Sequence, residues 1–161
     1  KQEINLVVAA SYIDTLSLKS TKTTPSDIVE CKNLIAKYDL NKDEMYLDGL
    51  SITDMSDIKA CSLNGLKKYE INNNKVYSSY VQVTEDELNK IPLILKEIPR
   101  TMRNKGVDYF VFIVTNVSNM TTKSYLLSKN FGSSIEEAEY NHIASRGQEI
   151  IPELERKLMR K

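Results

Sequence analysis

The sequence Tyr109-Phe110-Val111-Phe112-Ile113-Val114 is a continuous run of β-branched and aromatic residues. Such a run is typical of a strand that lies at the centre of a sheet and is buried on both faces. Asn116 to Met120 then predicts a turn, and Lys123 to Ser128 predicts a strand that returns beside the first. The expected fold is therefore organised around a central strand at residues 109–114.

Two further strands are expected before the central one. Leu66 to Ile71 and Val76 to Val83 favour pleated structure, and Asn72-Asn73-Asn74 lies between them. Because Asn tolerates a positive φ, this segment predicts a hairpin with an asparagine turn. The sheet should then be mixed, since hairpin strands are antiparallel whereas strands joined through a helix can be parallel.

Three helices are expected around the sheet. Thr84-Glu85-Asp86-Glu87 places acidic residues at the start of a helix that runs towards Lys105-Gly106. Ser133 to Glu137 predicts the start of a short helix, and Ile150 to Met159 predicts an amphipathic helix near the end of the chain. The predicted fold class is α/β, with a mixed β-sheet of about five strands covered by helices and preceded by a further strand and a helical segment.

The preceding strand is predicted at Ile4-Asn5-Leu6-Val7-Val8-Ala9-Ala10, with Asp14 just past its carboxyl end. In open α/β sheets ligands bind at that end. Thr24 and Pro25 have the chemistry of a helix N-cap and first helical position. Asp14, Lys19 and a helix amino terminus would thus lie close together. The alternative interpretation is that Asp14 only caps a turn and that Lys19 is solvated, since such features are common at loops.

Helical spacing continues from Ser26 to Tyr38 and from Asn41 to Leu50. The polar, turn-rich segment from Ser51 to Asp57 is the best candidate for a linker. We therefore expect two units, residues 1–55 and residues 56–161.

Composition restricts the possible partners. Lys plus Arg equals Asp plus Glu, at 22 each, so no overall charge recruits nucleic acid or an anionic membrane.

Cys31 and Cys61 lack metal-ligand spacing, which favours reduced thiols in a cytoplasmic protein. No apolar run is long enough to span a membrane and no signal peptide is recognisable, so we expect a soluble protein. A chain that starts at Lys1 and moves straight into a core segment is expected to be cut from a longer protein.

Candidate anion contacts lie in two places. Ser145-Arg146-Gly147 stands directly before a predicted helix, and it combines a guanidinium with a glycine that lets the backbone approach an anion. Lys67 and Lys68, at the start of the first hairpin strand, form a second candidate. His142 is the single histidine and has no partner motif for nucleophilic or metal chemistry. For each of these residues a solvated or structural role is the alternative.

Together these segments resemble one family. Ile13-Asp14-Thr15-Leu16-Ser17-Leu18-Lys19-Ser20, followed by Thr23-Thr24-Pro25-Ser26-Asp27, is similar to the Ser-Asp-Thr-Leu-x-Phe-Lys-Ser-Pro-Thr-x-Thr segment of manganese-dependent (family II) inorganic pyrophosphatases. Ser145-Arg146-Gly147-Gln148-Glu149-Ile150-Ile151-Pro152 is similar in spacing to their Ser-Arg-Lys-Lys-Gln-Val-Val-Pro motif. The resemblance covers nearly the whole chain but only the carboxyl-terminal part of that architecture. The same associated domain occurs in short-chain exopolyphosphatases and other members of the DHH phosphoesterase superfamily.

The resemblance implies a division of roles. A preceding domain would supply the Asp-His-His motif and most ligands for two Mn or Mg ions, and Asp14 would complete the metal site. Residues 1–55 would be the tail of that metal-binding domain, and residues 56–161 the substrate-binding domain. Arg146 and Lys68 match the cations that act on pyrophosphate, with Ser145, His142 and Lys19 as further substrate contacts. The chain alone would be inactive and would hold metal weakly, while homodimer formation stays open.

The chain also departs from the family pattern. Gly147 and Gln148 replace two lysines, and His142 stands near a position where glycine is usual. A weaker cationic clamp is compatible with pyrophosphate, with polyphosphate in an exopolyphosphatase, or with another phosphoester. It is also compatible with a non-catalytic module that binds phosphate or dimerises.

Overall fold

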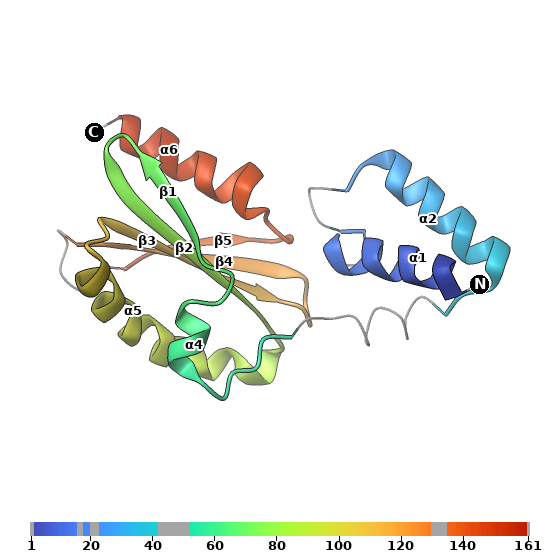
Figure 1. Cartoon of the computed structure of the whole chain (residues 1–161), viewed down its shortest axis with the longest axis horizontal. Helices are drawn as coiled ribbons and strands as arrows, with labels where there is room; N and C mark the ends of the chain where they lie inside the picture. The colour runs from blue at the N-terminus through green and yellow to red at the C-terminus, as the bar shows by residue number, and fades with distance from the viewer. Residues whose placement is uncertain (1, 16–17, 20–22, 42–51, 130–134, 161) are drawn as a thin grey trace.

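The computed structural model describes residues 2–15, 18–19, 23–41, 52–129 and 135–160. Its centre is a mixed sheet with strand order β1-β2-β3-β4-β5 (Figure 1). The strands are β1 (Lys67–Ile71), β2 (Asn74–Val83), β3 (Tyr109–Asn116), β4 (Thr121–Ser128) and β5 (Ile135–Tyr140). β2 and β3 are parallel, and the other neighbouring strands are antiparallel. The predicted fold class, a mixed five-stranded sheet with helices around it, is confirmed.

The first two strands form the predicted hairpin. Asn72 and Asn73 have φ angles of 48° and 59°, in the left-handed region that a tight hairpin turn requires and that Asn tolerates. The register places Lys67 opposite Ser78. Side chains that face each other across a strand pair share one face of the sheet, so Lys67 and Ser78 lie on the same side.

Helices cover both faces of the sheet (Figure 1). One face is covered by α4 (Ile58–Ser62), the 3₁₀ helix η1 (Glu85–Lys90) and α5 (Ile91–Lys105), and the other by α6 (Ile151–Met159), which follows the π-helical turn η2 (Arg146–Ile150). The two predicted helices at 84–105 and 150–159 are therefore confirmed. Among the described residues, no helix combines the length and the apolar content that crossing a bilayer requires.

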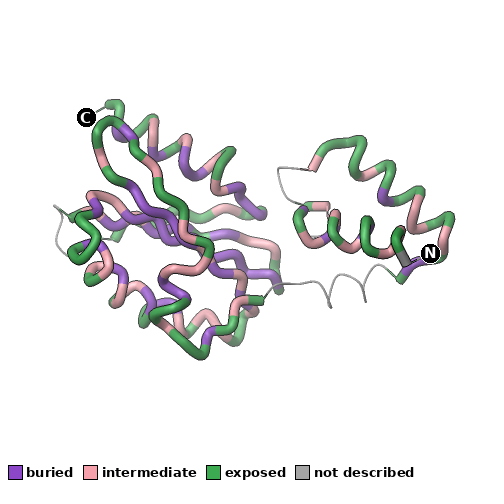
Figure 2. The backbone as a smooth tube through the Cα atoms, in the orientation of Figure 1, coloured by how far each residue is buried: buried purple, intermediate pink, exposed green. Residues whose placement is uncertain are grey.

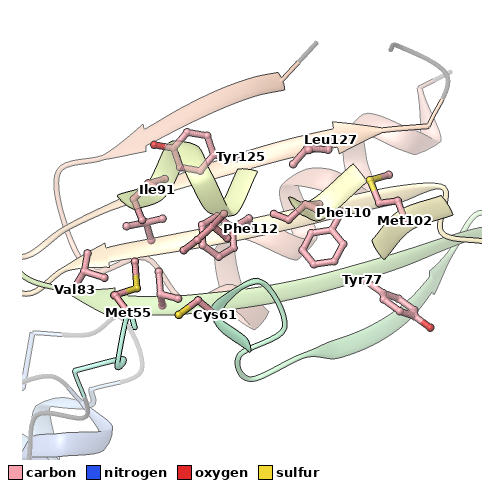
Figure 3. Close-up of a cluster of buried hydrophobic side chains, with 14 of the residues drawn as sticks. Met55, Cys61, Tyr77, Val83, Ile91, Met102, Phe110, Phe112, Tyr125 and Leu127 are labelled. Atoms are coloured by element: carbon pink, nitrogen blue, oxygen red, sulfur yellow. The ribbon is translucent and has the colours of Figure 1, made fainter. Parts of the chain in front are cut away.

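β3 is buried on both faces, as its apolar run predicts (Figure 2). Phe110 and Phe112 pack in the cluster beneath α5, which Figure 3 shows. Val111 and Ile113 belong to the second cluster, beneath α6. The alternation follows from the two-residue period of a strand, and it places two separate cores on the two faces of one sheet.

The predicted strand at residues 4–10 is wrong, because this segment lies in the helix α1 (Gln2–Asp14). α1 packs against α2 (Pro25–Tyr38), where Val8 and Tyr12, one turn apart, are buried beside Cys31. Periodicity does not separate a short apolar strand from a helix. Here the helix satisfies its own backbone, although two of its apolar side chains, Leu6 and Val7, are 70% and 59% exposed. The N-cap of α2 is confirmed, since Thr24 and Asp27 form a reciprocal capping box.

The predicted short helix beginning at Ser133 is also contradicted, because residues 135–140 form strand β5. β5 pairs with β4, and this pairing satisfies backbone groups that β4 would otherwise leave open at the edge of the sheet. Its side chains are mostly exposed, and Glu139 contacts Lys123 of β4 at 2.5 Å. Long-range pairing therefore overrides the local signal for a helix start.

The segment predicted as a linker is partly packed onto the sheet domain. The backbone N–H of Thr53 donates to Gln82 O at 2.8 Å, and Met55 is buried in the cluster beneath α5. Most of the helix predicted at residues 41–50 lies outside the described residues. The chain therefore contacts the sheet from Thr53 onward.

Candidate functional site

A cavity of about 410 Å³ lies on the α6 face of the sheet, beside the turn η2. One wall is residues 143–148, which connect β5 to α6, and a second is formed by Lys67, Tyr80 and Gln82 of the hairpin. Ile113 and Thr115 of β3, together with Ile13 and Asp14 at the carboxyl end of α1, complete the lining. Segments far apart in the sequence therefore line one cavity. Among their residues are Asp14 and Arg146, which the sequence predicts to face a common site.

The Arg146 side chain is held at the cavity by the hairpin. Its Nη1 donates to the carbonyl oxygens of Gly65 at 2.7 Å and of Ser78 at 3.4 Å. Its guanidinium carbon lies 5.2 Å from the ring centroid of Tyr80, a cation–π contact. Among the described residues these hydrogen bonds engage Nη1 alone, so the donors on Nη2 and Nε are available to an anion.

Gly65 makes this arrangement possible. Its φ is 56°, which disfavours other residues, and an added Cβ would lie 2.7 Å from Cδ1 of Tyr80. Only glycine lets the backbone approach the ring while its carbonyl accepts from Arg146. Sequence reasoning missed both Gly65 and Tyr80, because nothing local indicates that they meet Arg146, which follows Gly65 by 81 residues.

Ser145 forms the start of the η2 turn. Its Oγ accepts from the N–H of Gln148 at 3.3 Å, and its own N–H donates to Glu149 Oε1 at 2.6 Å. Ser145 is 5% exposed. It therefore lines the cavity but primarily holds the backbone on both sides of Arg146.

The structure brings Lys67, rather than the predicted Lys68, to the cavity. Lys68 pairs with Tyr77 in the hairpin register, and its Nζ lies 5.7 Å from the Tyr77 ring centroid. Tyr77 belongs to the cluster beneath α5, so Lys68 lies on the opposite face of the sheet. The two-residue period of β1 decides between these neighbours once the register is known.

His142 and Lys19 are outside the cavity lining. His142 Nε2 lies 2.7 Å from Glu149 Oε2, and the imidazole meets the ring of Tyr140 edge-on. Lys19 is exposed, and its N–H donates to the carbonyl of Thr15 just after α1. The structure therefore does not place His142 or Lys19 where it would touch a ligand in this cavity.

Asp14 is the carboxylate on the cavity wall. The described residues contain no group of three or more His, Cys, Asp and Glu side chains that could hold a metal ion. Metal sites built by proteins need several ligands. Asp14 fits the role of one ligand, and this part of the chain does not supply a complete metal site.

The shifted pKa values lie outside the cavity. Burial, followed by its hydrogen bond to Glu153, raises the pKa of Tyr140 to about 12. Burial, followed by Asp57 and Asp54, raises the pKa of the Cys61 thiol, which contacts the Asp54 carbonyl. Both groups stay protonated near neutral pH, so neither behaves as a nucleophile or base there.

The fold belongs to a known class. It matches a crystal structure described as that of a family II inorganic pyrophosphatase from Methanococcus jannaschii, with a TM-score of 0.71 and 22% identity, over 94% of this chain and 53% of that one. The sheet and its helices correspond to the carboxyl-terminal domain of that fold. No family model matches the chain.

Sequence comparison identifies the same group. A Bacillus cereus protein and a Bacillus anthracis protein, both named as manganese-dependent inorganic pyrophosphatases, are 26% and 28% identical over 96% of this chain. One from Lactobacillus gasseri is 24% identical over 92%. The chain spans about half the length of these curated relatives, 53–54%. Nearly the whole chain is therefore similar to about half of proteins named as manganese-dependent inorganic pyrophosphatases.

Proposed function

We propose that the chain is the substrate-binding portion of a manganese-dependent inorganic pyrophosphatase. The observation that carries this proposal is the meeting of Arg146, Lys67 and Asp14 at one cavity, from three separate elements. Guanidinium and ammonium groups bind phosphate, and a carboxylate oxygen is a ligand that Mn²⁺ accepts. The names of the relatives support the same substrate and the same metal.

In this proposal the cations of the cavity bind and orient pyrophosphate. Arg146, fixed by the Gly65 carbonyl and the Tyr80 ring, presents its outer N–H groups to one phosphate. Lys67 adds a second positive charge at the same wall. Both would offset the charge of the transferring and leaving phosphates, and Arg146 is already held in place to do so. A divalent metal, when bound with Asp14 among its ligands, would activate the attacking water.

The proposal includes the domain division predicted from the sequence. Residues 1–55 would be the tail of the metal-binding domain, since α1 and α2 enclose a small cluster of their own. Residues 56–161 would be the substrate-binding domain, whose sheet packing begins a few residues earlier, at Thr53. Free thiols at Cys31 and Cys61 support a cytoplasmic location.

A second candidate substrate is polyphosphate or another phosphoester. Gly147 and Gln148 line the cavity where the resembling motif has two lysines. A less positive cavity holds a compact, highly charged anion less tightly. Competition between pyrophosphate and longer polyphosphates separates the pyrophosphatase from the exopolyphosphatase. The absence of binding to both would favour a non-catalytic dimerisation module.

Calorimetric titration of the chain with pyrophosphate tests the proposal. We expect weak binding that Arg146→Ala reduces by roughly tenfold or more, since a hydrogen bond to a charged group is worth about 1.5–3 kcal/mol. Arg156→Ala, at an exposed position of α6, is the matched control and should bind as the unchanged chain does. Equal binding by the Arg146→Ala variant would remove Arg146 from the site. Mn-dependent hydrolysis of pyrophosphate by this chain alone would contradict the conclusion that its metal site is incomplete.

A further inference from the structure

We propose that His142 and Glu149 form a positioning pair that fixes the cavity wall around Arg146 and thereby sets how tightly an anion is held. This inference rests on the proposed function of the cavity. His142 Nε2 lies 2.7 Å from Glu149 Oε2. The pair encloses residues 143–148, and every residue of that run lines the cavity. The contact therefore ties together the two ends of the segment that forms this cavity wall.

Glu149 also fixes the backbone directly before Arg146. Its Oε1 accepts from the N–H of Ser145 at 2.6 Å, while its Oε2 faces His142. One carboxylate thus joins the end of β5 to the first turn of the helix that carries Arg146. The Glu149 side chain is 25% exposed, and a carboxylate that accepts an N–H with limited solvent access makes a strong hydrogen bond.

The two ends of the Arg146 side chain are then held by different elements. Its guanidinium is fixed by the Gly65 carbonyl and the Tyr80 ring, and its backbone is fixed through Ser145 by Glu149. A preformed group loses little conformational freedom when an anion binds. If the pair is broken, part of that ordering has to take place on binding, and affinity falls.

Among residues 143–148 of the cavity wall, Arg146 carries the positive charge, and its neighbours Gly147 and Gln148 are neutral. How tightly this wall holds an anion therefore depends on how well Arg146 is positioned.

A double-mutant cycle on pyrophosphate affinity tests the pair. We expect His142→Ala and Glu149→Ala each to weaken calorimetric binding by roughly three- to tenfold. We expect the double variant to bind no more weakly than Glu149→Ala alone, because the contact is already lost. Glu149→Gln should recover part of the affinity, since its amide oxygen still accepts from Ser145. Effects of the two changes that multiply, or no effect of either, would overturn the proposal.

A ligand-free measurement separates this inference from the function of the cavity. Hydrogen exchange at the Ser145 amide should be slow in the unchanged chain, faster in Glu149→Ala and slow again in Glu149→Gln. Unaltered exchange in Glu149→Ala overturns the pair alone. Absence of pyrophosphate binding by the unchanged chain overturns the proposed function, and the anion role of the pair with it. The control pair is Lys123 and Glu139, on the α5 face of the sheet, where alanine variants should leave affinity unchanged.

Discussion

Replacing Gly65 by alanine should destabilise the chain and weaken anion binding through a single contact. The backbone at Gly65 has a φ of 56°, and a Cβ there would lie 2.7 Å from Cδ1 of Tyr80 and closer still to Cε1. The ring of Tyr80 supports the guanidinium of Arg146. The added methyl group therefore forces the ring away, and Arg146 loses its support.

Gly106 provides a matched control for the magnitude. Its φ is 60°, and among the described residues nothing lies within 4 Å of an added Cβ. Gly106→Ala should cost only the left-handed backbone penalty, roughly 1–2 kcal/mol. Gly65→Ala carries the same penalty plus overpacking of about 1–3 kcal/mol, so its total is roughly 2–5 kcal/mol.

Urea denaturation measures both free energies of unfolding, and calorimetry with pyrophosphate measures binding. Gly65→Ala should lose more stability than Gly106→Ala, and it alone should bind pyrophosphate more weakly. Equal losses of stability in the two variants would refute the overlap with Tyr80. Unchanged binding in Gly65→Ala would show that the ring does not position Arg146.

Two other predictions follow from strand register and from a shifted pKa. Lys67→Ala should weaken pyrophosphate binding severalfold, whereas Lys68→Ala should leave it unchanged, because only Lys67 lies at the cavity; the reverse result in calorimetry would mean that the register of β1 is wrong. The hydrogen bond from Lys129, followed by that from the Lys75 N–H, lowers the pKa of Asp108 from its ordinary 3.8. The Asp108 carboxylate therefore contributes stability above about pH 4 that is lost as the pH falls through its lowered pKa. Asp108→Asn should have a lower unfolding temperature than the unchanged chain at neutral pH, and the difference should shrink as the pH falls below about 4. A difference that stays constant as the pH is lowered would exclude this linkage.

Local chemistry predicted much of the sheet domain. The apolar run at 109–114 predicted a strand buried on both faces, and the asparagines at 72 and 73 predicted the hairpin. The Thr24 capping box and the amphipathic spacing of α5 and α6 are likewise local features. In each case a few neighbouring residues restrict the backbone strongly enough that distant contacts change little.

Local chemistry failed where two conformations were close in free energy. Residues 4–10 are apolar enough for a strand or a helix, and packing of Val8 and Tyr12 against α2 decides for the helix. Residues 133–137 carry a polar helix-start pattern, but pairing with the open edge of β4 makes residues 135–140 a strand. Both errors arise because the deciding hydrogen bonds and contacts involve residues far away in the sequence.

The candidate site divides in the same way. The amino-acid sequence alone predicted Asp14, Ser145 and Arg146 as candidate site residues, and the structure places all three in the lining of one cavity, although Asp14 ends a helix instead of following a strand. Only the tertiary structure selected Lys67 over Lys68, since the pairing register determines which face of the sheet each side chain occupies. The support of Arg146 by Gly65 and Tyr80 was likewise decided by folding, because it requires the backbone of the hairpin and a side chain near the end of the chain to meet in space.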